Sequence, residues 1–331
     1  MSIDWGDQPG AGDDLVDPQP GSREHLGRRL GNLSPGHPSF PHDSFPAGSD
    51  RRSERPRPLT DAEHADHVRD IRARLDKARA NGLATDVQHT IDPAREVWSA
   101  DRDAIHDAII ADLYARAADV PCERKAILAG GLAGAGKSTV LQDLAGIDQS
   151  QYLTLNPDEI KAEMARLQLI PEIIGLSPME ASYLVHEESS YLARQLGLRA
   201  EGDGRNLIWD VTMSSHASTE GRIDELRGAG YSFIEAIFVQ IPVELSLHRA
   251  STRYREGQDS YWLGEGLGGR LIPEEVIRSQ FDPVWGSVNR RNFETLKPRF
   301  DAWSVYDNSV DGGSPALVGT SIRKASRDEW R

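Results

Sequence analysis

The chain has 331 residues and a formal net charge of −14 at pH 7. This length allows one large α/β domain with a smaller appendage, or two domains. The acidic balance argues against a broad nucleic-acid-binding surface, because phosphate backbones are bound by clustered Lys and Arg. The one cysteine, Cys122, excludes an intramolecular disulfide and fits a reducing compartment.

The N-terminus gives no sign of export or membrane insertion. The first residues, Met-Ser-Ile-Asp-Trp-Gly, lack the basic start and apolar run of a signal peptide. No apolar stretch reaches the roughly 18 residues that a membrane-spanning helix needs. We therefore expect a cytoplasmic protein with no membrane partner.

Residues 1–58 differ in composition from the rest of the chain. Nine of the 19 prolines lie there, with Gly, Ser, Asp and Arg and few aliphatic residues. Such a segment buries too little apolar surface to offset the entropy lost on ordering. The composition predicts a disordered Pro/Gly-rich tail, with a solvated basic linker formed by Arg51, Arg52, Arg55 and Arg57.

A helical pattern begins at Thr60, where Thr60-Asp61-Ala62-Glu63 is a capping box. Aliphatic residues then recur at helical spacing until Asn81-Gly82: Val68, Ile71, Leu75 and Ala78. A second helix is predicted from about Ser99, with one apolar face made by Ile105, Ile109 and Leu113. Residues 59–119 are therefore expected to be a helical segment that packs on the core or acts as a regulatory module.

From residue 120 onward, apolar runs typical of strands alternate with helical stretches. The runs are Ala126–Ala129, Tyr152–Leu155, Asn206–Trp209, Phe233–Gln240 and Trp303–Tyr306. This alternation predicts βαβ units and a mostly parallel sheet with helices on both faces. Ligands of such sheets bind beyond the carboxyl ends of the strands. We expect residues 120–331 to form one α/β domain of the P-loop NTPase type.

The first of these runs leads into a complete phosphate-binding loop. Residues 131–138 read G-L-A-G-A-G-K-S, the G-x-x-x-x-G-K-[ST] pattern, between the strand and a helical stretch. Lys137 is expected to reach the β- and γ-phosphates and Ser138 to ligate Mg²⁺. The alternative is a Gly-rich turn that binds nothing. The pattern favours nucleotide binding by Gly131, Gly134, Ala135, Gly136, Lys137, Ser138 and Thr139.

The polar sequence N-P-D-E-I-K follows the run that ends at Leu155. A carboxylate near the γ-phosphate can accept the proton of an attacking hydroxyl, and Asp158 is the candidate for this base. The alternative is that Asp158 caps a helix that begins at Glu159, and taken alone the motif favours the cap, because Asp is common there.

Two further segments carry candidate acids. His186-Glu187-Glu188 lies on an amphipathic helix, where one glutamate could point into the crevice, although solvated charges are the commoner explanation. The strand 206–209 leads into Asp210-Val211-Thr212. Asp210 could act on Mg²⁺ through water, and Asp210 or Thr212 could bind substrate hydroxyls. The alternative for Asp210 is a carboxylate that satisfies nearby N–H groups.

Arginines follow the strand 233–240, around a Gly-rich interval, 257–269, that has the composition of a mobile lid. They are Arg249, Arg253, Arg255 and Arg270. Arginines of a lid neutralise charge on a transferred phosphoryl group. Two of the four are expected instead to pair with helix-surface acids such as Glu244 or Glu256.

Taken in order, these motifs resemble the zeta toxin family of toxin–antitoxin kinases. The resemblance covers about residues 120–315 and rests on the phosphate loop, Asp158-x-x-Lys161, the acid and Thr at 210 and 212, Arg253-Tyr254, Arg270-Leu271-Ile272-Pro273 and Tyr306-Asp307-Asn308-Ser309. It implies a P-loop kinase that transfers the ATP γ-phosphate to the 3′-hydroxyl of a UDP-N-acetylhexosamine such as UDP-N-acetylglucosamine. It also implies an antitoxin protein as a partner.

The resemblance implies a role for each matched residue. Asp158 becomes the base, Lys137 and Ser138 hold ATP and Mg²⁺, and Arg253 and Arg270 clamp the transferred phosphate. The sugar site is implied to contain Lys161, Glu188, Asp210 and Thr212, with Glu187 as an alternative to Glu188.

The acceptor side departs from the family pattern. Asp210 stands where the family has a strand-end glutamate, and Met213-Ser214-Ser215-His216 replaces an expected arginine or glycine–threonine pair. Phosphorylation of NAD or of another nucleotide or sugar therefore stays open. An ATP-dependent switch that binds a partner, without small-molecule chemistry, is a further alternative. A GTPase is disfavoured, because no N-K-x-D or T-K-x-D motif occurs.

Overall fold

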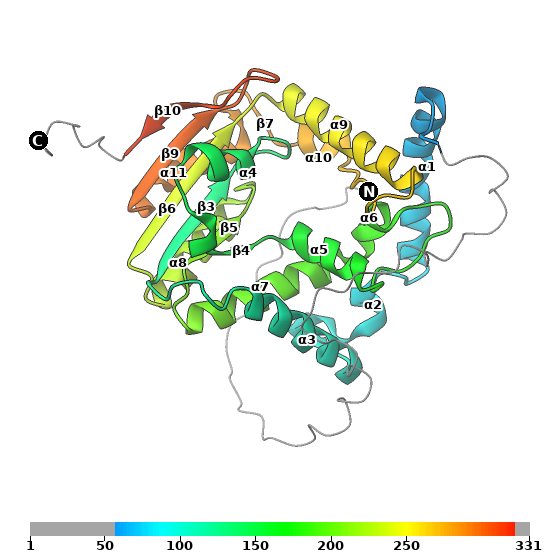
Figure 1. The fold of residues 1–331 in the computed structure, drawn as a ribbon, viewed down its shortest axis with the longest axis horizontal. Coiled ribbons are helices and arrows are strands. Elements are labelled where there is room, and N and C mark those ends of the chain that lie inside the picture. Colours follow the sequence, from blue (N-terminus) through cyan, green and yellow to red (C-terminus); the bar gives the residue numbers. More distant parts are fainter. Residues whose placement is uncertain (1–56, 322–331) are drawn as a thin grey trace, which may run out of the picture. The chain divides into compact units, whose positions relative to one another are not determined.

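A six-stranded sheet organises residues 57–321, the part of the chain that the computed structural model describes. Its strands are β3 (Lys125–Gly130), β4 (Leu153–Leu155), β5 (Leu207–Asp210), β6 (Phe233–Gln240), β9 (Ala302–Asp307) and β10 (Ala316–Thr320). Their spatial order is β10-β9-β6-β3-β5-β4 (Figure 1). Strands β3, β4, β5, β6 and β9 run parallel to one another, and β10 pairs antiparallel with β9 at one edge. The predicted mostly parallel sheet is confirmed, whereas β10 was not predicted.

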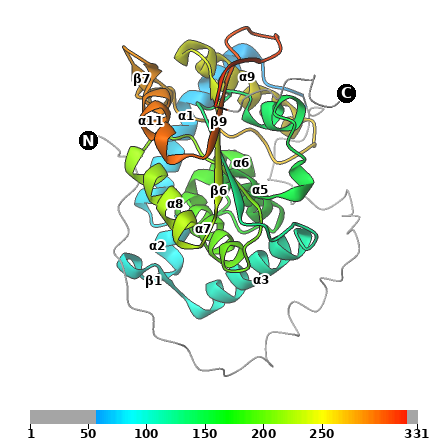
Figure 2. The same ribbon diagram turned by 90° about the vertical axis from the view of Figure 1, so that its left-hand side faces the viewer.

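Both faces of the sheet are buried. Successive residues of a strand point to opposite sides, so each central strand contributes to two core clusters. In β3, Leu128 packs with Phe238 in one core cluster, whereas Ile127 packs with Ile237 in another. Helices α7 (His186–Gly202), α8 (His216–Gly228) and α11 (Val288–Leu296) contribute to the first cluster, and α9 (Val243–Trp262) contributes to the second. Figure 2 shows helices on both sides of the sheet, as predicted.

The two helices predicted before the sheet are present. Helix α1 (Asp61–Ala80) begins with a reciprocal capping box, in which Glu63 N donates to Thr60 Oγ1 and Thr60 N donates to Glu63 Oε2, and it ends at Asn81. Helix α3 (Ala100–Arg116) follows Ser99 and buries Ile109. The expected tail, apart from residues 57 and 58, lies outside the described residues.

The remaining helices and strands are short. They are α2 (Thr85–His89), β1 (Thr90–Asp92), β2 (Val97–Trp98), α4 (Lys137–Thr139), α5 (Pro157–Arg166), α6 (Pro178–Ala181), α10 (Glu274–Arg278), β7 (Phe281–Asp282) and β8 (Gly286–Ser287). The helix after the phosphate loop is one turn of α4 followed by a π-helical turn, Val140–Leu144. Such π turns are frequent at functional sites.

The interval 257–269, expected to be a lid, is only partly a loop. Residues 257–262 are the last turns of α9, and a loop follows them up to Pro273. The glycines let this loop pack closely on its neighbours. A Cβ at Gly269 would lie 2.1 Å from the carbonyl oxygen of Tyr254, and one at Gly268 would lie 2.1 Å from Ser177 Oγ. The expectation of a lid over the whole interval is therefore corrected to a packed loop over its second half.

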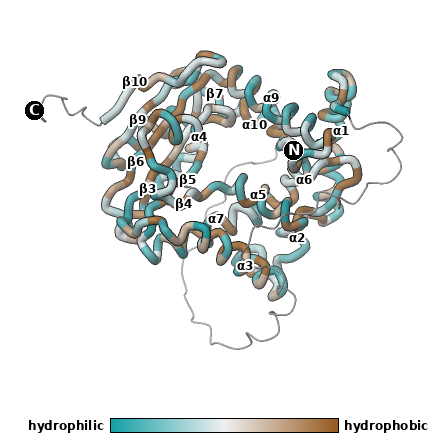
Figure 3. Tube along the Cα trace, in the orientation of Figure 1, coloured by the Kyte–Doolittle hydropathy of each residue, from teal (hydrophilic) through white to brown (hydrophobic). Residues whose placement is uncertain are grey.

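Hydrophobic and hydrophilic residues are mixed along the helices (Figure 3). Accordingly, no helix within residues 57–321 is long and apolar enough to cross a membrane.

Candidate active site

Polar residues from three neighbouring strands meet beyond the carboxyl ends of the sheet. Asp210 lies at the end of β5, and its Oδ1 is 3.3 Å from Lys137 Nζ, in the loop that follows β3. Its Oδ2 accepts a hydrogen bond of 2.9 Å from Asn156 Nδ2, which follows β4. Asp210 therefore connects the phosphate loop to the segment that carries Asp158, at the edge where ligands of such sheets bind.

The phosphate loop has a backbone that only glycine adopts readily. Gly131, Gly134 and Gly136 have φ angles of 138°, 69° and 86°. A Cβ at Gly131 would lie 2.3 Å from Val239 O, and one at Gly136 would lie 2.6 Å from Asn308 Nδ2. The amide of Asn308 donates a 2.8 Å hydrogen bond to the carbonyl of Ala135, within the loop. The loop is thus a built cradle that fits a nucleotide phosphate.

Two side chains of the loop fit the roles that the motif predicts, namely phosphate binding for Lys137 and Mg²⁺ ligation for Ser138. Lys137 Nζ folds back over the loop and lies 3.4 Å from the carbonyl oxygen of Gly131. Ser138 is exposed at the start of α4. No cluster of three or more His, Cys, Asp and Glu within residues 57–321 is arranged to hold a metal. Mg²⁺ at a phosphate loop needs only one hydroxyl and a nearby carboxylate, because phosphates and water supply the other ligands. Ser138 supplies the hydroxyl, and Asp210, which lies 3.3 Å from the side chain of the adjacent Lys137, supplies the carboxylate.

Asp158 lies among positive charges. Its Oδ2 is 2.6 Å from Arg270 Nη2, and its Oδ1 is 3.2 Å from Lys161 Nζ. Burial raises the pKa of the Asp158 carboxyl, but the charges of Arg270, Lys161 and Arg253 outweigh this effect, so the pKa lies below its ordinary value. Asp158 is therefore ionised at neutral pH.

Asp158 is not the N-cap of a helix. Helix α5 begins at Pro157, and Asn156 caps it by accepting a hydrogen bond of 2.9 Å from Asp158 N. The alternative interpretation of Asp158 as a helix cap is therefore wrong. The side chain of Asp158 instead forms ion pairs with Arg270 and Lys161.

His186, whose role was not predicted from the sequence, lies beside Lys161. The side chain of Lys161 is 4% exposed, and burial lowers its pKa. Its Nζ lies 3.1 Å from His186 Nδ1. Burial, and then the charge of Lys161, lower the pKa of His186 to about 4. His186 is therefore neutral at pH 7, and with Nδ1 accepting from Lys161 its proton resides on Nε2.

Glu188 does not join this cluster. Its side chain is fully buried, and both carboxylate oxygens are occupied between α3 and α7. Arg102 donates to them at 2.5 and 2.8 Å, and His106 Nε2 lies 2.6 Å from Oε1. The expectation that Glu188 lines a sugar site is therefore corrected. Glu187, the alternative, is exposed one residue earlier on α7 and lies near enough to Lys161 to raise its pKa.

Of the four arginines, two form ion pairs with other acids and two act on Asp158. Arg249 pairs with Asp311 at 3.1 Å, and Arg255 pairs with Asp259 at 3.0 Å, so both have ion-pair partners other than Asp158. Their partners are not the glutamates that the sequence suggested. Arg270 contacts Asp158 directly, and the exposed Arg253 acts on the pKa of Asp158 through its charge.

Thr212 lies next to the phosphate loop through its backbone. Its carbonyl accepts hydrogen bonds from Gly131 N at 3.3 Å and from Asn289 Nδ2 at 2.7 Å. Its exposed hydroxyl lies 2.9 Å from Ser214 Oγ. Roles for Asn156 and Asn308 were not predicted from the sequence, although both residues follow predicted strands, where site residues are expected.

The Zeta toxin family model matches residues 114–311, more than half of the chain. Among curated proteins, none matches the chain significantly in sequence.

Several solved structures are similar to this chain. The AvrRxo1-ORF1:-ORF2 complex with ATP is 19% identical over 72% of this chain and 76% of the other, with a TM-score of 0.55. The same complex with sulphate ions is 20% identical over 72% and 77%, with a TM-score of 0.54. A structure from the PezAT toxin–antitoxin system of Streptococcus pneumoniae is 19% identical over 66% and 81%, with a TM-score of 0.48.

Proposed function

The chain belongs to the zeta toxin family and is an ATP-dependent phosphotransferase, and we propose that it transfers the γ-phosphate of ATP to a hydroxyl of a nucleotide sugar such as UDP-N-acetylglucosamine. The observation that carries this proposal is the contact between Asp158 and Arg270, since it pairs the expected base with an expected phosphate clamp. Asp210 connects this pair to Lys137 of the phosphate loop, which supports a single site.

In the proposed reaction, each of these side chains acts on one part of the transfer. Asp158 accepts the proton of the acceptor hydroxyl, whose oxygen forms the new bond to the γ-phosphorus as the bond to the ADP oxygen breaks. Lys137 binds the β- and γ-phosphates, and Arg253 and Arg270 neutralise charge on the moving phosphoryl group. Ser138, with Asp210 through water, would hold Mg²⁺, which neutralises phosphate charge when bound.

The acceptor is proposed to lie against the first turns of α5 and α7. Lys161 there supplies a buried positive charge, and neutral His186 supplies a hydrogen-bond donor at Nε2. Glu187 and Thr212 add an acid and a hydroxyl that suit sugar hydroxyls. Positive charge beside hydroxyl-binding groups favours an acceptor that carries both phosphate and sugar. The family membership further supports an antitoxin protein as a proposed partner.

The proposal is tested by incubating the purified full chain with γ-labelled ATP, Mg²⁺ and a panel of acceptors. The panel contains UDP-N-acetylglucosamine, related nucleotide sugars, NAD and aminoglycosides, and the products are resolved by mass. A singly phosphorylated UDP-N-acetylglucosamine supports the proposal. Label in NAD or an aminoglycoside would replace the acceptor class, and bound ATP without transfer to any member would favour the ATP-dependent switch.

A further inference from the structure

Helix α1 lies outside the family-matched residues 114–311, yet it packs against the elements that carry both phosphate-clamping arginines (Figure 1). Ile71 of α1 is fully buried in a cluster with Tyr254, and Leu271 packs against the same cluster. Tyr254 directly follows Arg253 in the chain, and Leu271 directly follows Arg270. The apolar face of α1 therefore shares one core cluster with the chain neighbours of both arginines.

A buried carboxylate, Glu180 of α6, joins α1 to α9. Its side chain has no exposed surface. Its Oε1 accepts a 2.6 Å hydrogen bond from the Tyr254 hydroxyl and lies 2.7 Å from His67 Nε2 of α1. Its Oε2 accepts a 2.7 Å hydrogen bond from Ser177 N, at the start of α6. A buried carboxylate with this many donors fixes the geometry of all three helices, because losing any donor is costly.

The loop before Arg270 is packed against α6 and α9. Met179 N of α6 donates a 3.1 Å hydrogen bond to the carbonyl of Leu267. Gly268 and Gly269 approach Ser177 and Tyr254 so closely that a side chain at either glycine would collide with them. The position of Arg270 is thus set by α6 and α9, which Glu180 holds to α1.

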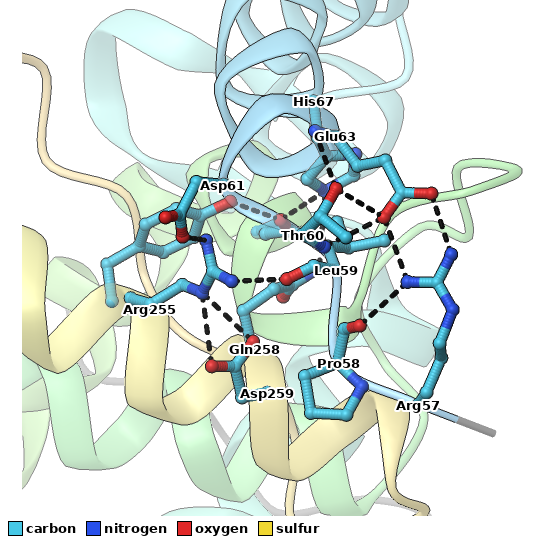
Figure 4. Close-up of polar contacts among 12 residues, drawn as sticks. Arg57, Pro58, Leu59, Thr60, Asp61, Glu63, His67, Arg255, Gln258 and Asp259 are labelled. Atoms are coloured by element: carbon cyan, nitrogen blue, oxygen red, sulfur yellow. Dashed lines mark hydrogen bonds and ion pairs between the residues drawn. The ribbon is translucent and has the colours of Figure 1, made fainter.

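The entry to α1 is fixed to α9 as well (Figure 4). The guanidinium of Arg255 donates to the carbonyl of Leu59 and lies 3.7 Å from Asp61 Oδ1, while Asp259 holds it at 3.0 Å. Arg255, a candidate for the site in the sequence, therefore anchors the N-terminus of α1.

We propose that α1 and residues 57–60 form a brace that positions Arg253 and Arg270 for phosphoryl transfer. His67, Ile71 and Glu180 act as positioning residues, since they touch the arginine-bearing elements and not the reacting groups. The inference rests on the proposed function, which gives the two arginines their role. A misplacement of about 1 Å can cost about 100-fold in rate. The brace should therefore act on kcat, while the phosphate loop binds ATP independently of it.

The test compares His67→Ala with Arg69→Ala in the full chain. Arg69 is a matched control on the same helix, because its pair with Asp66 is exposed and contributes little. The measurements are kcat, the KM for ATP and hydrogen–deuterium exchange of residues 263–273. His67→Ala is expected to lower kcat about tenfold or more, to leave the KM for ATP unchanged and to speed exchange in residues 263–273. His67→Gln, which keeps a donor for Glu180, should restore most of kcat.

A second variant approaches the same carboxylate from α9. Tyr254→Phe removes one donor to Glu180 but keeps the ring in the core, so it should give the same pattern as His67→Ala. The inference is overturned if His67→Ala and Arg69→Ala have equal kcat and equal exchange, or if exchange rises throughout the chain rather than in residues 263–273. If the wild-type chain transfers no phosphate, the proposed function fails, and exchange in residues 263–273 alone decides whether α1 holds the loop.

Discussion

Arg270 Nη2 lies 2.6 Å from Asp158 Oδ2, so the expected base and an expected phosphate clamp are in direct contact. The side chains of Arg270 and Asp158 are 29% and 42% exposed, which leaves the pair open to a substrate. Such pairing keeps both groups charged and in place, and preorganised charges of this kind stabilise transition states effectively.

Lys137→Ala should weaken ATP binding and abolish phosphoryl transfer. Hydrogen bonds to charged groups contribute about 1.5–3 kcal/mol, so ATP affinity should fall about 10- to 100-fold. Isothermal titration with ATP and Mg²⁺ measures this effect. Lys125→Ala is the control, because Lys125 lies at the start of β3 and its pair with Glu123 is exposed. Unchanged ATP affinity in the Lys137 variant would show that the loop does not bind phosphate.

Gly131→Ala should remove ATP binding by distorting the loop. Its φ of 138° is unfavourable for alanine, and the added Cβ would lie 2.3 Å from the backbone oxygen of Val239. The free energy of unfolding should drop by more than about 1 kcal/mol. Gly221→Ala in α8 meets no atom within 4 Å, and should stabilise by about 0.5–1 kcal/mol. Urea unfolding compares the two, and equal stability of both variants would contradict the strained geometry of Gly131.

Glu188→Ala should destabilise the fold instead of weakening acceptor binding. The change leaves Arg102 buried without its carboxylate, which costs about 3–5 kcal/mol in such pairs. Glu187→Ala, on the exposed side of α7, should change stability by less than about 0.5 kcal/mol. Urea unfolding of both variants measures the difference. A stable Glu188 variant with a raised acceptor KM would restore Glu188 to the sugar site.

The same carboxylate predicts part of the acid sensitivity of the fold. Burial raises the pKa of Glu188, but hydrogen bonds from His106 and Arg102 outweigh it and lower the pKa to about 2. Because the folded pKa lies below the ordinary 4.5, this stabilisation is present above pH 4.5 and is lost as pH falls toward 2. Glu188→Gln should therefore show a smaller loss of stability over that range than the wild-type chain.

The raised pKa of Glu201 predicts that the fold loses stability as the pH rises. Burial raises its pKa from 4.5 to about 7, although Arg222 opposes the shift. Because the folded pKa lies above the unfolded one, its contribution is present below pH 4.5 and is lost as pH rises through 7. Urea unfolding at pH 5 and pH 8 should show a larger drop for the wild-type chain than for Glu201→Gln. Parallel behaviour of the two proteins would exclude a buried, protonated Glu201.

The sequence predicted the parallel strands well, because strands buried on both faces carry continuous apolar runs. It missed β10, whose Leu317 and Val318 are 44% and 55% exposed at the edge of the sheet. Such an edge strand depends on pairing with β9 rather than on its own burial pattern.

The site was predictable where it is local. The phosphate loop is a run of consecutive residues, so its pattern is complete in the sequence. The choice between Glu187 and Glu188 is not local, because it depends on which side of α7 faces Arg102, 86 residues earlier. Arg255 was ambiguous for the same reason, since its partner Leu59 lies 196 residues away. Only tertiary packing shows that Arg255 anchors α1, whereas Arg253 and Arg270 act on Asp158.

If Asp158 is the base of a phosphoryl transfer from ATP, the variant Asp158→Asn should lose transfer but not nucleotide binding. The change keeps the size of the side chain and removes its charge. The measurement is transfer of label from γ-labelled ATP to UDP-N-acetylglucosamine, with ATP binding titrated on the same protein. We predict that transfer falls by about 10²–10⁴ while ATP affinity is unchanged. Wild-type transfer by Asp158→Asn, or loss of its ATP binding, would contradict the assignment of Asp158 as the base.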